Sequence, residues 1–207
     1  MTFVIGDIHG CSNSLMKLLE SLPLTAESKL IFLGDYIDRG PDSKGVLEIL
    51  LDLSKSYECI FIRGNHEQML LDYILEGENF DLWLMNGADA TLRSYGGIDK
   101  IPKQHIDFIQ STVLYAIKGN DLFVHAGVRP NIPIEKQNPF DLLWIRYEFI
   151  YSEAPLPSYR IFFGHTPFQE VLIMKDKIGL DTGCVYGNKL SAIALGTMKV
   201  YSSKCGG

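Results

Sequence analysis

The sequence predicts an α/β fold in which two β-sheets pack face to face and helices cover their outer faces, an αββα sandwich. Near-continuous apolar runs alternate with helical patterns in the first part of the chain, which is typical of parallel strands covered by helices. Closely spaced strand candidates without helices end the chain. Two sheets are the simplest arrangement that buries both patterns, so we expect residues 1–207 to form one domain.

The first part of the chain contains three successive units of strand, loop and helix. Apolar runs predict strands at residues 2–5, 29–33 and 59–62. Each run is followed by apolar residues at a helical period, which predict helices at residues 12–22, 41–53 and 66–75. Right-handed crossovers would make the three strands parallel.

The middle of the chain follows a different pattern. Residues 76–111 are predicted to form a helical cap inserted into the domain. A hairpin is expected next, and a proline-containing stretch at 128–158 reads as loop with a short helix near 141–150. The last residues, 202–207, are expected to fray. The hairpin strands and the final strands are expected at 113–117, 121–124, 171–174, 177–181, 190–195 and 199–201.

Composition narrows the class of protein. With 46% hydrophobic and 21% charged residues the chain is an ordinary globular domain, and no apolar run approaches the about 20 residues that span a bilayer. The net charge of −6 and the lack of a basic cluster give no source of nucleic-acid affinity. We therefore expect a cytoplasmic protein without membrane or nucleic-acid partners. The four cysteines, far apart and without a C-x-x-C pair, are expected to be reduced thiols.

Polar residues with metal-binding side chains follow five of the apolar runs. Because the carboxyl ends of strands in an α/β sheet emerge at one edge, these residues are expected to converge. The five motifs are Gly6-Asp7-Ile8-His9-Gly10, Gly34-Asp35, Gly64-Asn65-His66-Glu67, His125-Ala126-Gly127 and Gly164-His165-Thr166. The candidate metal ligands are Asp7, His9, Asp35, Asn65, His125 and His165.

This set of carboxylate, amide and imidazole groups suits Mn²⁺, Fe or Zn²⁺. Six ligands are too many for one ion that must keep open positions, so we expect two. If Asp35 bridges them, one ion takes Asp7 and His9 with it, and the other takes the remaining ligands. A hydroxide between the ions could then attack phosphorus in line, which makes phosphoester hydrolysis the working hypothesis.

Each residue taken alone has a structural alternative. Asp7 and Asp35 could cap helices, and a single histidine is more often packed than ligating. However, four of the five histidines lie in these strand-end loops, which favours the metal site. His105 has no such context and is expected to be a surface or partly packed helix residue.

Further charged residues suit phosphate chemistry. Arg39 could bind a phosphate dianion in a bidentate way, and Arg146 is a second candidate. His66 could protonate the leaving oxygen while Asp38 fixes its tautomer, although Asp38 could also be an ordinary surface partner of an arginine. Arg63 and Glu67 flank the 64–67 motif and are expected to form only a structural pair.

The motifs at residues 6–10, 34–40 and 64–67 resemble those of the phosphoprotein phosphatase family of metallophosphoesterases. The later motifs at 125–127 and 164–166, with Asn86-Gly87, Thr91-Leu92 and Ser94-Tyr95-Gly96, resemble its bacterial branch. The resemblance implies a calcineurin-like αββα sandwich and a dinuclear site, usually with Mn²⁺, bridged by Asp35. It also implies a His66–Asp38 acid dyad, phosphate binding by Arg39 and Arg146, and a pocket wall at Tyr186.

The motifs define a reaction but not a leaving group. We expect a serine/threonine protein phosphatase acting on phosphoprotein or small phosphoesters, since the short chain has no obvious region for a second nucleoside. A symmetrical diadenosine tetraphosphate hydrolase remains the alternative. A third reading, an inactive metal-binding interaction module, would show a lost ligand or acid, and this sequence keeps them all.

Overall fold

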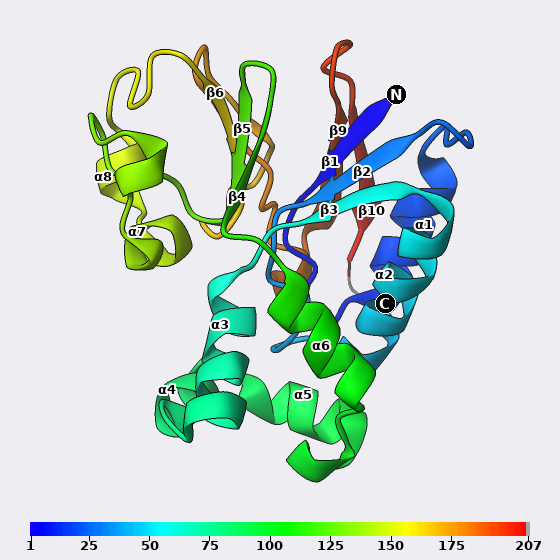
Figure 1. Ribbon diagram of the computed structural model, residues 1–207. Coiled ribbons are helices and arrows are strands. Elements are labelled where there is room, and N and C mark those ends of the chain that lie inside the picture. Colours follow the sequence, from blue (N-terminus) through cyan, green and yellow to red (C-terminus); the bar gives the residue numbers. More distant parts are fainter. Residues whose placement is uncertain (206–207) are drawn as a thin grey trace.

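Two five-stranded sheets form the centre of the protein in the computed structural model, which describes residues 1–205 (Figure 1). The first sheet has the strand order β10-β9-β1-β2-β3, and the second has the order β4-β5-β6-β8-β7. The first sheet contains β1 (Thr2–Ile5), β2 (Lys29–Phe32), β3 (Glu58–Phe61), β9 (Lys189–Ala194) and β10 (Val200–Lys204). The second contains β4 (Tyr115–Lys118), β5 (Asp121–Val124), β6 (Arg160–Phe163), β7 (Leu172–Ile173) and β8 (Lys177–Gly179).

The two sheets bury their facing sides against each other. β1, β2 and β3 are parallel, as are β5, β6 and β8, and in both groups the apolar runs point side chains to both faces. A buried cluster between the sheets includes Val4 and Ile31 from the first sheet and Phe123 and Phe162 from the second. The rings of Phe123 and Phe162 stack with their centroids 5.2 Å apart. This shared layer holds the carboxyl ends of both parallel groups at the same edge.

Helices cover the two outer faces. In Figure 1, α1 (Ser12–Ser21) and α2 (Ser43–Ser56) lie outside the first sheet, while α7 (Pro139–Trp144) and α8 (Tyr147–Ile150) lie outside the second. Their apolar faces pack on separate buried clusters. The predicted αββα sandwich is confirmed.

A group of helices lies below the sheets in Figure 1, at the edge where the parallel strands end. It begins with α3 (Asn65–Leu71), which continues as a π-helical turn (Asp72–Glu76). The helices α4 (Phe80–Met85), α5 (Ala88–Tyr95) and α6 (Lys103–Ser111) follow, with a 3₁₀ turn (Ile98–Lys100) before α6. We call residues 76–111 the cap. None of the helices described in residues 1–205 is long and apolar enough to cross a membrane.

The end of the chain departs from the expected meander. β7 and β8 complete the second sheet, whereas β9 and β10 return to the first sheet, where β9 pairs antiparallel with β1. A 3₁₀ helix (Cys184–Tyr186) lies in the crossing segment, so the expectation that the chain ends in strands without helices was wrong. The expectation of fraying from Ser202 was also wrong, because β10 pairs through Lys204 and Ser203 Oγ donates to the Ser14 carbonyl. Gly206 and Gly207 lie outside the described residues.

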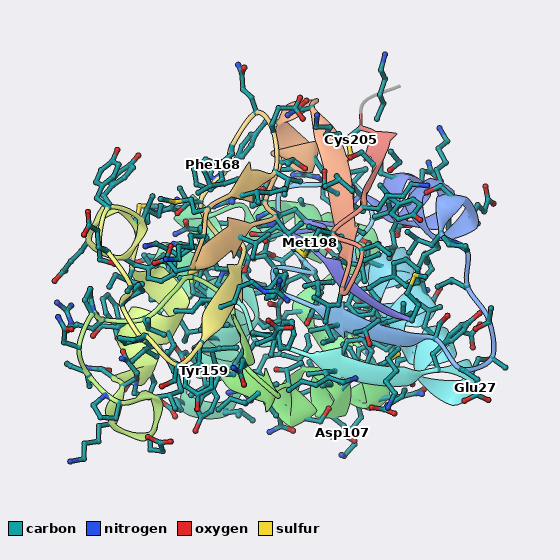
Figure 2. The ribbon with its side chains drawn as sticks, turned by 90° about the horizontal axis from the view of Figure 1, so that it is seen from above. Glu27, Asp107, Tyr159, Phe168, Met198 and Cys205 are labelled. Atoms are coloured by element: carbon teal, nitrogen blue, oxygen red, sulfur yellow. A yellow bond between two sulfur atoms is a disulfide. The ribbon has the colours of Figure 1, made fainter. Side chains whose placement is uncertain are left out.

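Two of the four cysteines form a disulfide, which corrects the expectation of four reduced thiols. Cys184 and Cys205 are bonded, with their Cα atoms 5.1 Å apart. Cys205 lies at the end of β10, which Figure 2 shows from above, and its N–H donates to the Asn188 carbonyl. The β9-β10 hairpin thus brings the end of the chain back to the 3₁₀ helix, a proximity that 21 residues of sequence separation conceal. Cys11 and Cys59 are free.

Candidate active site

The loops after the parallel strands of both sheets meet at the edge beside the cap. Their backbones are bonded to one another: the N–H groups of Ile8 and His9 donate to the Asp35 carbonyl, and the N–H of Gly164 donates to the His125 carbonyl. The sheet arrangement therefore brings residues from 7 to 165 into one site, as strand ends in an α/β sheet should.

Asp35 occupies the centre of this site. Its Oδ2 lies 3.4 Å from His9 Nε2 and 3.9 Å from His66 Nε2. Its Oδ1 lies 3.4 Å from His125 Nε2, on the other side of the carboxylate. Two groups of ligand-type side chains could each hold a metal ion, one made of His9, Asp35 and His66 and the other of Asp35, His125 and His165. One carboxylate belongs to both groups.

Asn65 lies between the two histidines of the second group. Its Oδ1 is 2.9 Å from His125 Nε2 and 3.0 Å from His165 Nδ1. On the other side of the ring, His125 Nδ1 donates to the Leu33 carbonyl at 2.8 Å, which turns Nε2 toward the site. His9 is held in the same way, because its Nδ1 donates to the Ile37 carbonyl at 3.0 Å.

Asp7 was expected to join His9 and Asp35 in one ligand group, but it does not belong to the group that the structure forms there. Its Oδ2 accepts the backbone N–H of His165 at 2.9 Å, and it is His66 rather than Asp7 that completes the group around His9. Asp7 Oδ1 is buried without a hydrogen-bond partner. Its neighbour Gly164 leaves room for this oxygen, since a Cβ there would overlap Asp7 Oδ1.

The backbone of the site is unusual. Five of the nine non-glycine residues with a left-handed φ, in the part of the chain that is described, belong to these loops. Such dihedrals are costly for residues with a Cβ and persist where surrounding contacts enforce them, commonly at functional sites. The five are His9, Asp35, Asp38, Arg39 and His165.

Burial sets the charge states of the site. Burial lowers the pKa of His9 to about 3 and, together with the charge on His125, holds the pKa of His165 well below its usual range. Burial alone would raise the pKa of Asp35, but the His125 and His66 imidazoles bring it well below its ordinary value. Burial would lower the pKa of His125, but the Asp35 carboxylate raises it to about 9. The site thus places two neutral imidazoles, those of His9 and His165, and the charged imidazole of His125 around an ionised carboxylate.

His66 and Asp38 form a close pair. His66 Nδ1 lies 2.8 Å from Asp38 Oδ2, and both side chains are completely buried. With Nδ1–H bonded to the carboxylate, Nε2 is the free ring atom, and it has no hydrogen-bond partner. The geometry matches a dyad that can present one ring nitrogen to a reacting oxygen.

The two arginines lie on different sides of the site. Arg39 Nη1 is 3.0 Å from His9 Nε2, and its guanidinium carbon lies 6.0 Å from the centre of the exposed Tyr186 ring. Arg146 Nη1 donates to the His165 carbonyl at 3.0 Å. Each guanidinium is half-buried, one beside each of the two ligand groups.

Glu67 was missed as a site residue. The side chain is fully buried and accepts backbone N–H bonds from Asp35, Tyr36, Ile37 and Gly64 at 2.8 to 3.3 Å. Glu67 therefore fixes the loop that carries the central carboxylate. The expected structural pair with Arg63 is wrong, because Arg63 instead donates to side chains and carbonyls of Gln68, Gln110 and Thr112. Its position directly after Asn65 and His66 is the sequence feature that could have indicated Glu67 as a site residue.

Asp181 is a second buried residue of the site that the strand-end motifs did not include. Asp181 follows β8 and is 5% exposed. Burial raises the pKa of its carboxyl to about 6, and the carboxylate in turn raises the pKa of Asp7. It is another polar residue just beyond the carboxyl end of a strand.

The donor set fits divalent metal ions. Asp7 Oδ1, His66 Nε2 and His165 Nε2 are buried polar atoms without partners, which is costly unless something binds them. They lie among carboxylate, amide and imidazole groups, the chemistry that Mn²⁺, Fe and Zn²⁺ accept. A site with this composition beside two guanidinium groups is suited to metal-assisted hydrolysis of anionic esters.

Comparison with known proteins shows which family this chain belongs to. The Calcineurin-like phosphoesterase family matches residues 2–194, and the chain belongs to this family. A curated relative in Anoxybacillus flavithermus, bis(5'-nucleosyl)-tetraphosphatase PrpE [asymmetrical], is 30% identical over 96% of this chain and 92% of its own length. Serine/threonine-protein phosphatase 1 of Salmonella typhimurium is 32% identical over 91% and 89%. The protein is therefore a phosphoester hydrolase.

Solved structures share the fold. A crystal structure described provisionally as a diadenosine tetraphosphatase superposes with a TM-score of 0.78 over 99% of this chain and 93% of its own, at 23% identity. A serine/threonine phosphatase from Saccharomyces cerevisiae superposes with a TM-score of 0.67 over 100% and 79%, at 16% identity. At these identities the likeness concerns the fold.

Proposed function

We propose that this protein is a dinuclear metal-dependent phosphomonoesterase, and that its substrates are serine/threonine phosphoproteins. The observation that carries the proposal is the position of Asp35, whose two carboxylate oxygens face two different groups of imidazoles. A single carboxylate shared in this way is suited to bridging two cations.

The candidate ligands would divide between two ions, with Asp35 common to both. Asp7 and His9 would serve one ion, and Asn65, His125 and His165 the other. Mn²⁺ is the proposed metal, with Fe and Zn²⁺ compatible with the same donors. Bound divalent cations would lower the pKa of a water molecule and stabilise the entering and leaving oxygens of phosphoryl displacement.

The remaining residues act on the substrate. Arg39 and Arg146 would bind the phosphate oxygens from the two sides of the site, where their planar guanidinium groups can form paired bonds. His66 would give a proton to the leaving oxygen through Nε2, and Asp38 would hold its ring by Nδ1. Every residue of this scheme is present in the chain, which argues against an inactive interaction module.

A groove beside the metal ligands supports a polypeptide substrate. It has a volume of about 540 Å³ and runs from Asn65 between α4 and α7. Leu82 and Phe140 are exposed on its two sides, and Leu143 and Trp144 lie deeper. A polypeptide could place a side chain next to its phosphorylated residue in this groove, because clefts that combine apolar side chains with polar groups suit such contacts, and Gln68 and Asp72 also line it.

The test is a direct competition between substrates. The Mn²⁺-loaded enzyme is incubated with a phosphoserine peptide, with 4-nitrophenyl phosphate and with diadenosine tetraphosphate, and kcat/KM is compared. We expect phosphate release from the peptide to be the preferred reaction. Preferred hydrolysis of the dinucleotide would contradict the phosphoprotein assignment while leaving the metallophosphoesterase chemistry intact.

A dinucleoside tetraphosphate hydrolase is the second candidate, and the relatives favour it. Several of the curated relatives, at 28 to 32% identity, are named bis(5'-nucleosyl)-tetraphosphatase PrpE with asymmetrical cleavage. If the dinucleotide is the substrate, these names favour products of AMP and ATP over the two ADP molecules of a symmetrical cut. Chromatography of the nucleotide products distinguishes the two.

A further inference from the structure

The carboxylate of Asp38 is held from three directions. Besides His66 Nδ1, the indole Nε1–H of Trp83 donates to Asp38 Oδ2 at 2.7 Å. The hydroxyl of Thr91 donates to the other oxygen, Oδ1, at 2.6 Å. Asp38, Trp83 and Thr91 are all completely buried. Both carboxylate oxygens therefore have donors that do not come from the strand-end loops.

Thr91 also binds the backbone of the same residue. The N–H of Asp38 donates to Thr91 Oγ1 and to Ser43 Oγ, each at 3.0 Å. The two hydroxyl oxygens are 2.8 Å apart, and the Thr91 hydrogen is already directed at Asp38 Oδ1. Ser43 must then donate to Thr91, so the Thr91 hydroxyl has one definite orientation.

These donors belong to the cap. Trp83 lies in α4, where its ring packs near those of Tyr73 and Phe80, with centroids 6.0 and 6.3 Å away. Thr91 lies in α5. Between these helices, the Gly87 carbonyl accepts the N–H of Arg39 at 3.1 Å. Both cap helices are thus attached to the Asp38-Arg39 loop rather than to any metal-ligand candidate.

We infer that Trp83 and Thr91 are positioning residues for leaving-group protonation, and that the cap acts in catalysis by fixing Asp38 and, through it, the ring of His66. This inference rests on the proposed role of His66 as the acid. A carboxylate that accepts a single hydrogen bond can rotate about its Cβ–Cγ bond. Hydrogen-bond donors on both oxygens fix the plane of the carboxylate. The locked plane keeps the Nδ1–H of His66 bonded and directs Nε2 to one place, the alignment that proton transfer requires.

Two conservative variants remove one donor each. Trp83→Phe keeps an aromatic ring but removes the N–H, and Thr91→Val keeps the shape of the side chain but removes the hydroxyl. Thr91→Ser restores the hydroxyl and should rescue. The matched control is Tyr95→Phe in the same helix α5, because the Tyr95 hydroxyl bonds His105 at 2.7 Å and makes no contact with Asp38.

The readout is leaving-group dependence in the Mn²⁺-loaded enzyme. With phenyl phosphate, whose leaving oxygen needs a proton, kcat should fall by about 10-fold or more in both variants, toward the range of lost acid catalysis. With 4-nitrophenyl phosphate, whose leaving group departs as an anion, kcat should change by less than about threefold, because proton transfer contributes little there. Thr91→Ser and Tyr95→Phe should behave like wild type, and bound metal should be unchanged in all four.

A second arm tests whether the two residues act through His66. In a His66→Asn background, Thr91→Val should cause no further loss of kcat, since residues that act as one unit are not additive. Equal losses on both esters, or a full additional loss in the His66→Asn background, would overturn the inference. If Trp83→Phe does not fold, Thr91→Val carries the test alone. The phosphopeptide result plays no part in this comparison, so failure of the phosphoprotein assignment is seen separately.

Discussion

The strand-end loops and the cap contribute to one site in different ways. The loops supply the candidate metal ligands, and each of those follows an apolar strand with a glycine nearby. The cap supplies no ligand, but Trp83 and Thr91 hold the carboxylate that orients His66. The difference shows that sheet topology places the candidate ligands, whereas the carboxylate partner of the proposed proton donor is held by helices of a separate segment. Disrupting each side should therefore produce a different defect.

The largest effect is expected at the centre of the loops. Asp35→Asn removes the one carboxylate that faces both imidazole groups, so dinuclear metal loading should be lost. Turnover of 4-nitrophenyl phosphate should fall by about 10³-fold or more, as the metal contribution is worth several kcal/mol. Metal content and kcat are measured together. An Asp35→Asn protein with wild-type activity would remove the basis for a bridging role.

The histidine whose carboxylate partner is held by the cap should fail differently. His66→Asn is expected to keep bound metal but lose about 10²- to 10⁴-fold in kcat on esters with poor leaving groups, the usual contribution of a general acid. The loss should shrink for 4-nitrophenyl phosphate. The measurement is a series of aryl phosphates with increasingly basic leaving groups. A loss that stays constant along the series would show that His66 does not act as the acid.

Glu67 holds two of the strand-end loops together through their backbone N–H groups, and its loss should appear as lower stability. Glu67→Ala leaves four buried N–H groups without their acceptor, at about 1 to 3 kcal/mol for each unsatisfied group, although water entering the space will offset part of this. We expect the free energy of unfolding of the metal-free protein to drop by about 4 kcal/mol. Urea denaturation measures it, with the exposed Glu48→Ala as control. A change as small as that of the control would show that the loop does not depend on Glu67.

Loss of the disulfide should have the smallest effect, because it joins neither the strand-end ligand loops nor the cap. Closing a loop with a sequence separation of 21 restricts the unfolded chain by about 3 kcal/mol in the chain-entropy description. Cys205→Ser, or reduction of the wild type, should lower the unfolding free energy by up to about this amount. Thiol titration of the protein unfolded without reductant provides the check, and two titratable thiols are expected. Four titratable thiols after unfolding without reductant would contradict the bond.

The same comparison explains what could be predicted from sequence. The strand-end residues Asp7, Asp35 and His165 could be located because the apolar runs of the strands show where each strand ends. The αββα arrangement followed from the alternation of strand and helix patterns along the chain. Trp83 and Glu67 could not be placed, since no local pattern says which polar atom a buried indole or carboxylate will meet. The pairing of Cys184 with Cys205 was missed for the same reason, as it depends on a hairpin that returns to a loop in another part of the chain.

Metal stoichiometry tests the central claim most directly. Isothermal titration of the metal-free protein with Mn²⁺ should give two ions per chain for the wild type, with the second site lost in His125→Ala while a first site centred on His9 remains. The matching loss of the other site is expected for His9→Ala. A single ion per chain in a fully active wild-type enzyme would contradict the shared role of Asp35 and with it the proposed dinuclear chemistry.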